Sequence, residues 1–232
     1  MGVLIKCSDT EFTNYIGIAD YPILSSLKNL YYFGGTQAES IKDHSGNGND
    51  GTVSGSITVN SHTITFSGTG TEDKITAQNP TEGTSKITAL ALFKKTGKRG
   101  LVQNGAGTSS GFALGTERSL YFSGSFKDMT YTLPDSTGFY ILALVVGADG
   151  GTVYRSVSDS AVGVLAHNDA ANVLPSAIRS VNFGGTGYNW SMNGSADIAV
   201  AAYYEDALTV DQLKDTFGFL RLYAEKYNLT LA

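Results

Sequence analysis

The amino-acid sequence predicts an all-β protein, a two-sheet antiparallel β-sandwich with one C-terminal helix. Short apolar runs alternate with turn residues between residues 29 and 204, at the even spacing that is typical of sandwiches. Twenty-eight glycines against four prolines in 232 residues favour many tight turns between short strands. The last part of the chain has the apolar spacing of a helix instead. A closed barrel is the alternative arrangement for such strands.

The composition is that of a globular chain that is stabilised by its core. Hydrophobic residues make up 41% of the chain and charged residues 16%, far from the composition of disordered chains. The only cysteine, Cys7, excludes an intramolecular disulfide bond. It ends the apolar run Val3–Cys7, which favours a small core or edge residue over a reactive thiol.

Residues 1–26 precede the regular pattern. Val3–Cys7 and Tyr15–Ala19 have the composition of strands, and Asp20–Pro22 is a turn signal. This segment either adds strands to the sandwich or forms an arm that attaches to a partner, and we expect the arm. Residues 27–232 contain no solenoid-length repeat and no low-complexity tract, so we expect them to form one domain.

Three of the expected strands differ from the rest because they are apolar at successive positions. They are Ile87–Phe93, Tyr140–Val146 and Ile198–Tyr204. A strand with one face in water alternates between apolar and polar residues. We therefore expect these three in the middle of the sheets, with loops or the C-terminal helix covering their second face. Ser119–Phe122 and Met129–Leu133, by contrast, alternate as half-exposed strands do, and Met129, Tyr131 and Leu133 are expected on one face.

The pattern predicts the following strands, given in chain order. They are Asn29–Phe33, Thr52–Val59, Thr63–Ser67, Lys74–Ala77, Ile87–Lys95, Gly100–Gln103, Phe112–Leu114, Ser119–Ser123, Asp128–Leu133, Phe139–Val146, Thr152–Ser156, Val162–Ala166, Arg179–Phe183 and Ala196–Tyr204.

The C-terminal helix is expected to begin at an N-cap, Thr209. Gln212 lies three residues later, which is the spacing of a capping box. Apolar residues then recur at helical spacing, at Leu213, Phe217, Leu220 and Ala224. This stripe should lie on a face or edge of a sheet.

The segment Asp43–Val53 is expected to be a tight, ordered loop that leads into a strand. Asp43 and Ser45 can each bond the backbone two residues on, as Asx- and ST-turns do. With Asn47 they also match the first half of an EF-hand-like Ca²⁺ loop. The match fails at its twelfth position, which is Ser54 and not Glu. The alternatives are a Ca²⁺ site completed by a second loop and a turn that needs only its own hydrogen bonds.

Taken together, these segments resemble a known family. The run Asn29–Phe33 followed by Asp43–Val53 resembles the opening of concanavalin A-like domains of the laminin-G type. Later segments resemble that family in the same order: Ile64–Ile75, Ser85–Lys95, Phe183–Gly185, Ala196–Ala199 and Tyr203–Leu213. The resemblance covers residues 27–232 and implies a jelly-roll sandwich. It does not imply one function, because this fold hosts lectins, hydrolases and structural modules.

Charge and hydropathy argue against nucleic-acid and membrane partners. The net charge is −5, and the densest basic run, Phe93–Arg99, favours a solvated hairpin between two strands. No window approaches the roughly 20 apolar residues of a membrane span. No N-terminal export signal is visible either. We therefore expect no nucleic-acid binding, no membrane insertion, and synthesis in a cytosol.

Catalytic patterns are not evident. Retaining glycosidases need two carboxyl groups roughly 5 Å apart, and the E-x-D-x-E spacing of the family's hydrolases does not occur. His44, His62 and His167 lie outside known nucleophile or metalloprotease motifs. An enzyme that assembles its acids from distant strands stays an alternative.

Carbohydrate binding has a clearer candidate segment, from Gly184 to Gly194. It contains Tyr188, Asn189 and Trp190, the only tryptophan. Sugars stack on exposed aromatic rings, and amides read their hydroxyl groups. The alternative is that Trp190 fills one end of the core. We assign no residue a catalytic role and no cofactor other than the Ca²⁺ considered at Asp43, Ser45 and Asn47.

The favoured function is a non-catalytic recognition or assembly module of a phage virion, made in the host cytoplasm. It would be a capsid decoration, head-fibre or tail adhesion protein that contacts other virion proteins through residues 1–26 and cell-surface polysaccharide through its loops. Thirteen tyrosines suit such interfaces, including those of a homo-oligomer. The alternatives are a polysaccharide-cleaving glycoside hydrolase with dispersed acids and a secreted, extracellular bacterial lectin or adhesin module.

Overall fold

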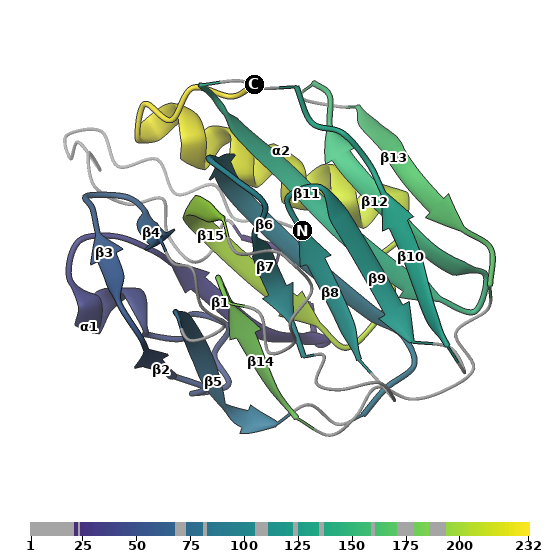
Figure 1. Cartoon of the computed structure of the whole chain (residues 1–232), viewed down its shortest axis with the longest axis horizontal. Helices are drawn as coiled ribbons and strands as arrows, with labels where there is room; N and C mark the ends of the chain where they lie inside the picture. The colour runs from purple at the N-terminus through teal and green to yellow at the C-terminus, as the bar shows by residue number, and fades with distance from the viewer. Residues whose placement is uncertain are drawn as a thin grey trace, which may run out of the picture.

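The computed structural model describes residues 21–22, 24–67, 73–80, 83–104, 111–122, 125–134, 137–158, 161–170, 179–185 and 194–232. The strands of these ranges form two antiparallel sheets stacked face to face (Figure 1). Neither sheet closes on itself in the described ranges, so the fold is the predicted sandwich and not the alternative barrel.

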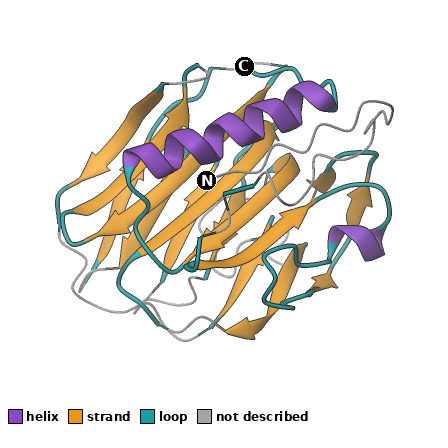
Figure 2. Cartoon of the chain, turned by 180° about the vertical axis from the view of Figure 1, so that it is seen from behind, coloured by secondary structure: helices purple, strands orange, loops and turns teal. Residues whose placement is uncertain are grey.

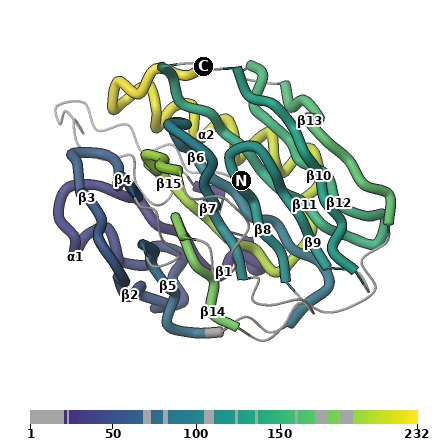
Figure 3. The backbone as a smooth tube through the Cα atoms, viewed as in Figure 1, coloured from purple at the N-terminus to yellow at the C-terminus, as the bar shows by residue number. Residues whose placement is uncertain are grey.

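Sheet A has eight strands in the described ranges. Seven follow one another in the order β13 (Val162–Asn168), β12 (Gly150–Ser156), β11 (Phe139–Gly147), β6 (Ile87–Lys95), β15 (Ser195–Tyr204), β4 (Ile64–Ser67) and β3 (Ile57–Val59). The eighth, β1 (Leu27–Tyr32), pairs with β15. Strands from the beginning and the end of the chain therefore lie side by side, which the colouring of Figure 3 makes visible.

Sheet B, which has seven strands among the described residues, lies in front of sheet A in Figure 1. Their order is β10 (Phe126–Thr130), β9 (Arg118–Phe122), β8 (Phe112–Gly115), β7 (Gly100–Gln103), β14 (Ser180–Phe183), β5 (Lys74–Pro80) and β2 (Gly51–Ser54).

Two apolar layers stabilise the fold. The first lies between the sheets and contains residues such as Phe66, Phe93 and Phe183, each with no more than 1% of its surface exposed. The second lies on the outer face of sheet A, where α2 (Val210–Lys226) crosses the strands (Figure 2). Leu213 and Phe217 of the helix belong to this second layer. Burial of this kind contributes about 1.5–3 kcal/mol for each large apolar side chain.

The three strands that are apolar at successive positions lie where the sequence predicts. β11, β6 and β15 are neighbours in the middle of sheet A. One face of each contributes to the layer between the sheets, and the other contributes to the layer beneath α2. Because water reaches neither face, these strands need no polar alternation.

Helix α2 begins and ends with local signals. The Thr209 side chain accepts a hydrogen bond from the N–H of Gln212, whose side chain accepts one from the N–H of Thr209, so the predicted capping box is confirmed. At the other end Asn228 adopts a left-handed φ of 55°. The N–H of Leu229 then donates to Ala224 O at 2.8 Å, as in a Schellman motif. The only other helix in the described ranges is the short α1 (Gln37–Ser40).

Three expectations from the sequence need correction. The segment Thr52–Val59 is not one strand, because it contributes to β2 in sheet B and to β3 in sheet A. The run Phe93–Arg99 is not a solvated hairpin, because it connects β6 of sheet A to β7 of sheet B, and both Phe93 and Arg99 have 0% of their surface exposed. Ser119–Phe122 is not half-exposed either, because Ser119, Leu120 and Tyr121 are all buried. Arg99 is buried because its own side chain donates hydrogen bonds to distant backbone groups, which are described below.

Most of the N-terminal segment, including Val3–Cys7, lies outside the described residues, so the arm and the domain boundary at residue 27 stay predictions. Tyr21 is nevertheless buried in the sandwich. Its ring meets that of Phe219 edge-on at 5.1 Å, and its hydroxyl lies 2.8 Å from that of Tyr204. In the part of the chain that the structure describes, no helix has the length and apolar character needed to span a membrane.

Candidate functional site

The loop of residues 43–50 is held largely by the carboxylate of Asp43. Its Oδ1 accepts hydrogen bonds from the N–H groups of Leu30 and Ser45, each at 3.0 Å. Its Oδ2 lies 2.7 Å from the Ser45 hydroxyl and accepts from the N–H of Asn49 at 3.0 Å. The bond from Ser45 is the predicted Asx-turn, and the bond from Leu30 fixes the loop on β1.

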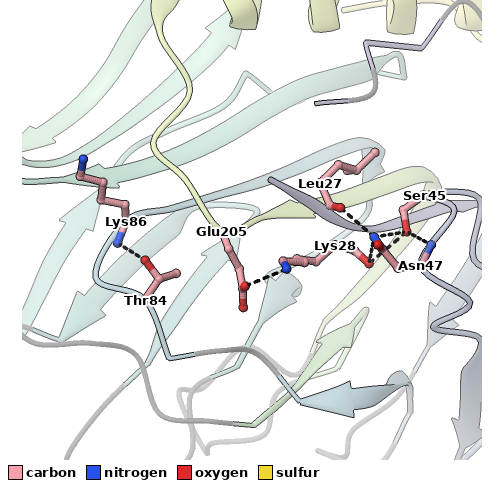
Figure 4. Close-up of polar contacts among 7 residues, drawn as sticks. All are labelled: Leu27, Lys28, Ser45, Asn47, Thr84, Lys86 and Glu205. Carbon is pink, nitrogen blue, oxygen red and sulfur yellow. Dashed lines mark hydrogen bonds and ion pairs between the residues drawn. The ribbon is translucent and has the colours of Figure 1, made fainter. Parts of the chain in front are cut away.

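Ser45 and Asn47 complete this attachment, as Figure 4 shows. Asn47 Nδ2 donates to Leu27 O at 2.8 Å and lies 2.9 Å from Ser45 Oγ. The structure therefore brings Asp43, Ser45 and Asn47 together. Among the described residues, no group of three or more His, Cys, Asp or Glu side chains is placed to hold a metal ion. Ca²⁺ binding at this loop stays a prediction.

The two ends of the Gly184–Gly194 segment are joined by the buried side chain of Arg99. Its Nε donates to Gly184 O, and its Nη1 donates to Gly194 O at 3.1 Å. Its Nη2 donates to Asp73 O, before β5, at 2.7 Å. A guanidinium group carries five N–H donors in a rigid plane, so this one side chain can position three backbone segments. Burial lowers the pKa of Arg99 below its ordinary value.

Backbone hydrogen bonds hold the same two ends on β7 and on the turn before it. The N–H of Gly184 donates to Leu101 O at 2.9 Å, and the N–H of Gly194 donates to Lys98 O at 2.7 Å. A Cβ atom added to Gly194 would lie 2.5 Å from Lys98 N, so this close approach requires glycine. Tyr188, Asn189 and Trp190 themselves lie outside the described residues, and their role in sugar binding stays a prediction.

A row of directly opposed residues crosses the outer face of sheet B beside this segment. In order across the sheet, the row is Thr52, Thr76, Asn182, Gln103, Ala113, Leu120 and Asp128. The chain neighbours of these residues, such as Val102 and Phe183, belong to the core between the sheets. Because side chains alternate along a strand, the row faces away from that core.

The middle of the row is enclosed although it faces away from the core. Gln103 and Ala113 have 0% of their surface exposed, and Leu120 has 3%. Among the described residues, neither the oxygen nor the nitrogen of the Gln103 amide has a hydrogen-bond partner. In the next residue, Asn104, Oδ1 accepts from the N–H of Phe112 at 3.2 Å, whereas Nδ2 has no partner in the part of the chain that the structure describes. Buried groups of this kind are rare enough to require an explanation.

The three histidines each contact a different neighbour. The His44 ring meets that of Tyr32 edge-on, and the His62 ring stacks on that of Tyr227 with centroids 4.1 Å apart. His167 Nδ1 lies 2.8 Å from the hydroxyl of Thr152. Burial, assisted by the charge of Lys42, lowers the pKa of His44, whose neutral form is therefore favoured.

Two of the hollows on the described surface are lined entirely by described residues. The larger, of about 620 Å³, lies between α2 and residues 228–231 and is lined in part by Gly218, Leu222 and Leu231. It does not adjoin the residues predicted to bind sugar. The smaller, of about 320 Å³, lies at the turn between β11 and β12.

Sequence patterns do not single out Arg99 or Gln103. Arg99 ends a basic run that has the composition of a solvated turn, and Gln103 ends the apolar run of β7. The one signal in the sequence was the position of these residues, because Arg99 directly precedes the short apolar strand β7 and Gln103 is its last residue. Their partners, or the lack of them, depend on strands that are distant in the sequence.

No family model matches the chain, and no curated protein matches its sequence. Solved structures do match its fold. The binding domain of Paraclostridial Mosquitocidal Protein 1 has a TM-score of 0.59 and 14% identity, covering 84% of this chain and 52% of that one. The Trypanosoma rangeli sialidase, solved in complex with sialic acid, has a TM-score of 0.59 and 14% identity, covering 86% of this chain and 34% of that one.

A third match covers nearly the whole of the other chain. It is domain 4 of AbnA, a GH43 extracellular arabinanase from Geobacillus stearothermophilus, in complex with arabinotriose. Its TM-score is 0.61 at 16% identity, covering 82% of this chain and 98% of that one. The present chain thus spans about half of the toxin domain and one third of the sialidase. At these identities the likeness shows the fold, which is a two-sheet β-sandwich.

Proposed function

We propose that this chain is a non-catalytic recognition module that binds carbohydrate with the outer face of sheet B and with the Gly184–Gly194 segment, which follows β14 in the chain. The observation that carries the proposal is the enclosed, unpartnered amide of Gln103, in a row that also contains Asn182 and Thr76. An unpaired buried polar group costs about 1–3 kcal/mol. Nothing within the row compensates this cost, so the amide calls for a partner from outside the row, and a bound ligand would supply one.

Carbohydrate suits this amide because a sugar hydroxyl both donates and accepts a hydrogen bond. The Gln103 oxygen needs a donor and its nitrogen needs an acceptor. Hydroxyl groups can meet both needs, directly or through an ordered water molecule. The aromatic rings expected at Tyr188 and Trp190 would supply the apolar contact that sugars require.

Two of the fold matches support the same class of ligand. The arabinanase domain was solved in complex with arabinotriose, and the Trypanosoma rangeli sialidase was solved in complex with sialic acid. This support is analogy alone, because one fold hosts many functions.

The test combines binding with stability. A glycan array identifies the sugar, and calorimetry then compares the wild-type chain with Gln103→Leu, Trp190→Ala and Tyr188→Phe. Leucine at position 103 removes the unpaired amide, so we expect urea unfolding to show a gain of about 1 kcal/mol. Sugar affinity should fall about tenfold at the same time.

Opposite changes in stability and affinity cannot arise from misfolding. Gln37→Leu, on the exposed α1, is the matched control and should leave affinity unchanged. Absence of any bound glycan on the array would contradict the proposal. So would a Gln103→Leu variant that binds as well as the wild-type chain. Release of reducing sugar from the bound glycan would overturn the non-catalytic assignment and favour a glycoside hydrolase.

We further propose that the module belongs to a phage virion, as a capsid decoration, head-fibre or tail adhesion protein attached through its N-terminal residues. An extra segment that precedes a recognition domain suits attachment to a particle. Because Tyr21 is part of the packed sandwich, the informative truncation removes residues 1–20 and keeps Tyr21.

Sedimentation with virions tests this setting. We expect the full chain to co-sediment with particles and the truncated chain to stay in the supernatant, while both unfold at the same urea concentration. Co-sedimentation of the truncated chain would contradict attachment through this segment. Recovery of the native protein from the medium and not from particles would favour the extracellular lectin or adhesin. Light scattering against the monomer mass of 24.5 kDa tests the expected homo-oligomer.

A further inference from the structure

The smaller hollow lies on the opposite side of the molecule from the proposed carbohydrate face. It opens on the outer face of sheet A, between the β11–β12 turn and the segment that leads from β15 to α2. Figure 2 shows α2 crossing this same face. The two elements approach closely, because a Cβ added to Gly147 would lie 3.3 Å from the Cβ of Ala207. All residues that line the hollow belong to the described ranges.

The floor of the hollow is set by strand register. Val145, Thr152 and His167 are directly opposed on β11, β12 and β13, so their side chains share one face. The Thr152 hydroxyl lies 2.8 Å from His167 Nδ1. Tyr154 is two residues further along β12 on the same face and is half-buried against the layer beneath α2. The floor thus has an apolar side and a hydroxyl–imidazole pair.

The rim carries one charge of each sign. Asp149 lies in the β11–β12 turn and Lys86 lies just before β6, and both side chains are exposed. The N–H of Lys86 donates to the hydroxyl of Thr84 at 3.1 Å, which fixes the backbone here (Figure 4). A lone anion in the hollow would meet the Asp149 carboxylate, and a lone cation would meet the Lys86 ammonium. The pair of opposite charges therefore disfavours a simple ion of either sign.

Size and lining indicate a different ligand class. The volume of about 320 Å³ is at the lower end of the roughly 300–1,000 Å³ of small-molecule sites, which is room for one sugar ring. Val145 and the Tyr154 ring offer an apolar surface, and Thr152, His167, Asp149 and Lys86 offer donors and acceptors around it. A pyranose ring has this composition, with an apolar face and hydroxyl groups at its edge.

We propose that this hollow is a second carbohydrate subsite, which takes one neutral pyranose unit against Tyr154 and reads its hydroxyl groups with Thr152, Asp149 and Lys86. It goes beyond the proposed function, because it lies on the other sheet and shares no residue with the Gln103 row. Two subsites on opposite faces would let one chain contact two glycan chains, which raises the overall affinity for a polymer.

The test locates binding directly. Two-dimensional amide NMR spectra of the full chain are recorded with the methyl pyranosides of glucose, galactose, mannose and N-acetylglucosamine, each at millimolar concentration. Sorbitol serves as an acyclic polyol of similar size. We expect at least one pyranoside, but not sorbitol, to shift the amide signals of residues 145–152 and 167 with a saturable titration curve.

Matched variants separate a hydrogen-bonding role from a structural one. Thr152→Val keeps the shape of the side chain and removes its hydroxyl, and Lys86→Gln removes the charge. Each should weaken binding about three- to tenfold, the effect of one lost hydrogen bond. Thr58→Val, on the exposed side of β3, and Lys42→Gln, in an exposed loop, should leave the curve unchanged.

The outcomes distinguish this site from the proposed function. If no pyranoside shifts the signals of the hollow, or if Thr152→Val and Lys86→Gln leave the titration unchanged, the second subsite is refuted. Shifts confined to residues around 103, 182 and 194 would support the first carbohydrate face and refute this one. Shifts at the hollow that persist in Gln103→Leu would support the second subsite on its own.

Discussion

Replacing Arg99 with methionine is expected to destabilise the fold by about 3 kcal/mol. Methionine keeps much of the apolar stem and removes the three hydrogen bonds to Gly184 O, Gly194 O and Asp73 O. Hydrogen bonds to a charged group contribute roughly 1.5–3 kcal/mol each, so three sum to about 4.5–9 kcal/mol. Removing the guanidinium also removes the cost of burying its charge, which is several kcal/mol. The hydrogen-bond contribution minus the cost of burying the charge gives the expected loss of about 3 kcal/mol.

Urea unfolding followed by circular dichroism measures this loss. With a slope of about 2–3 kcal/mol/M, the loss lowers the midpoint by roughly 1–1.5 M. Arg118→Met is the matched control, because Arg118 and its partner Asp128 have 43% and 41% of their side chains exposed. An exposed ion pair contributes about 1 kcal/mol or less. If Arg99→Met cost no more than Arg118→Met, the structural role assigned to Arg99 would be refuted.

Three further predictions follow from contacts described above. Asp43→Asn should cost about 1–3 kcal/mol in urea unfolding, because an amide nitrogen cannot accept the hydrogen bonds now made to one carboxylate oxygen; an unchanged midpoint would contradict the role of this loop as an anchor. Gly184→Ala should cost about 3 kcal/mol, since its φ is +77° and the new Cβ would lie 2.4 Å from the Phe66 ring; wild-type thermal stability would refute this steric argument. Burial raises the pKa of Tyr204 to about 12, above the ordinary 10. The folded state then holds this proton more tightly than the unfolded state. The contribution of Tyr204 to the free energy of unfolding should therefore be fully present below pH 10 and fall between pH 10 and 12. Absorbance of tyrosinate at 295 nm, recorded with circular dichroism, checks this, and an early titration of all tyrosines before unfolding would contradict it.

The parts of the fold that the sequence predicts are those determined by neighbours in the chain. β6, β11 and β15 are apolar on both faces, so their central position in sheet A follows from composition. The capping box of Thr209 with Gln212 spans three residues, and the Asx-turn of Asp43 with Ser45 spans two. Such signals are complete within one short segment.

The parts that the sequence does not predict depend on residues far apart in the chain. Arg99 bonds carbonyl groups 26 and 95 residues away, and carbonyl groups carry no side-chain signal in a sequence. Gln103 faces outward because its neighbour Val102 faces the core, and β7 lies between β8 and β14, an order that local patterns do not reveal. The second subsite likewise requires the register of three strands.

The hydrogen bonds of Arg99 end on backbone oxygens, which every amino acid possesses. Mutational drift between positions 186 and 193 therefore leaves both attachment points intact, whichever side chains are substituted there. A library of randomised octapeptides grafted into this interval could be displayed on an unchanged scaffold and selected for new specificities. Natural variants of this protein could likewise change the residues of this interval, and with them the binding specificity, while the fold stays the same.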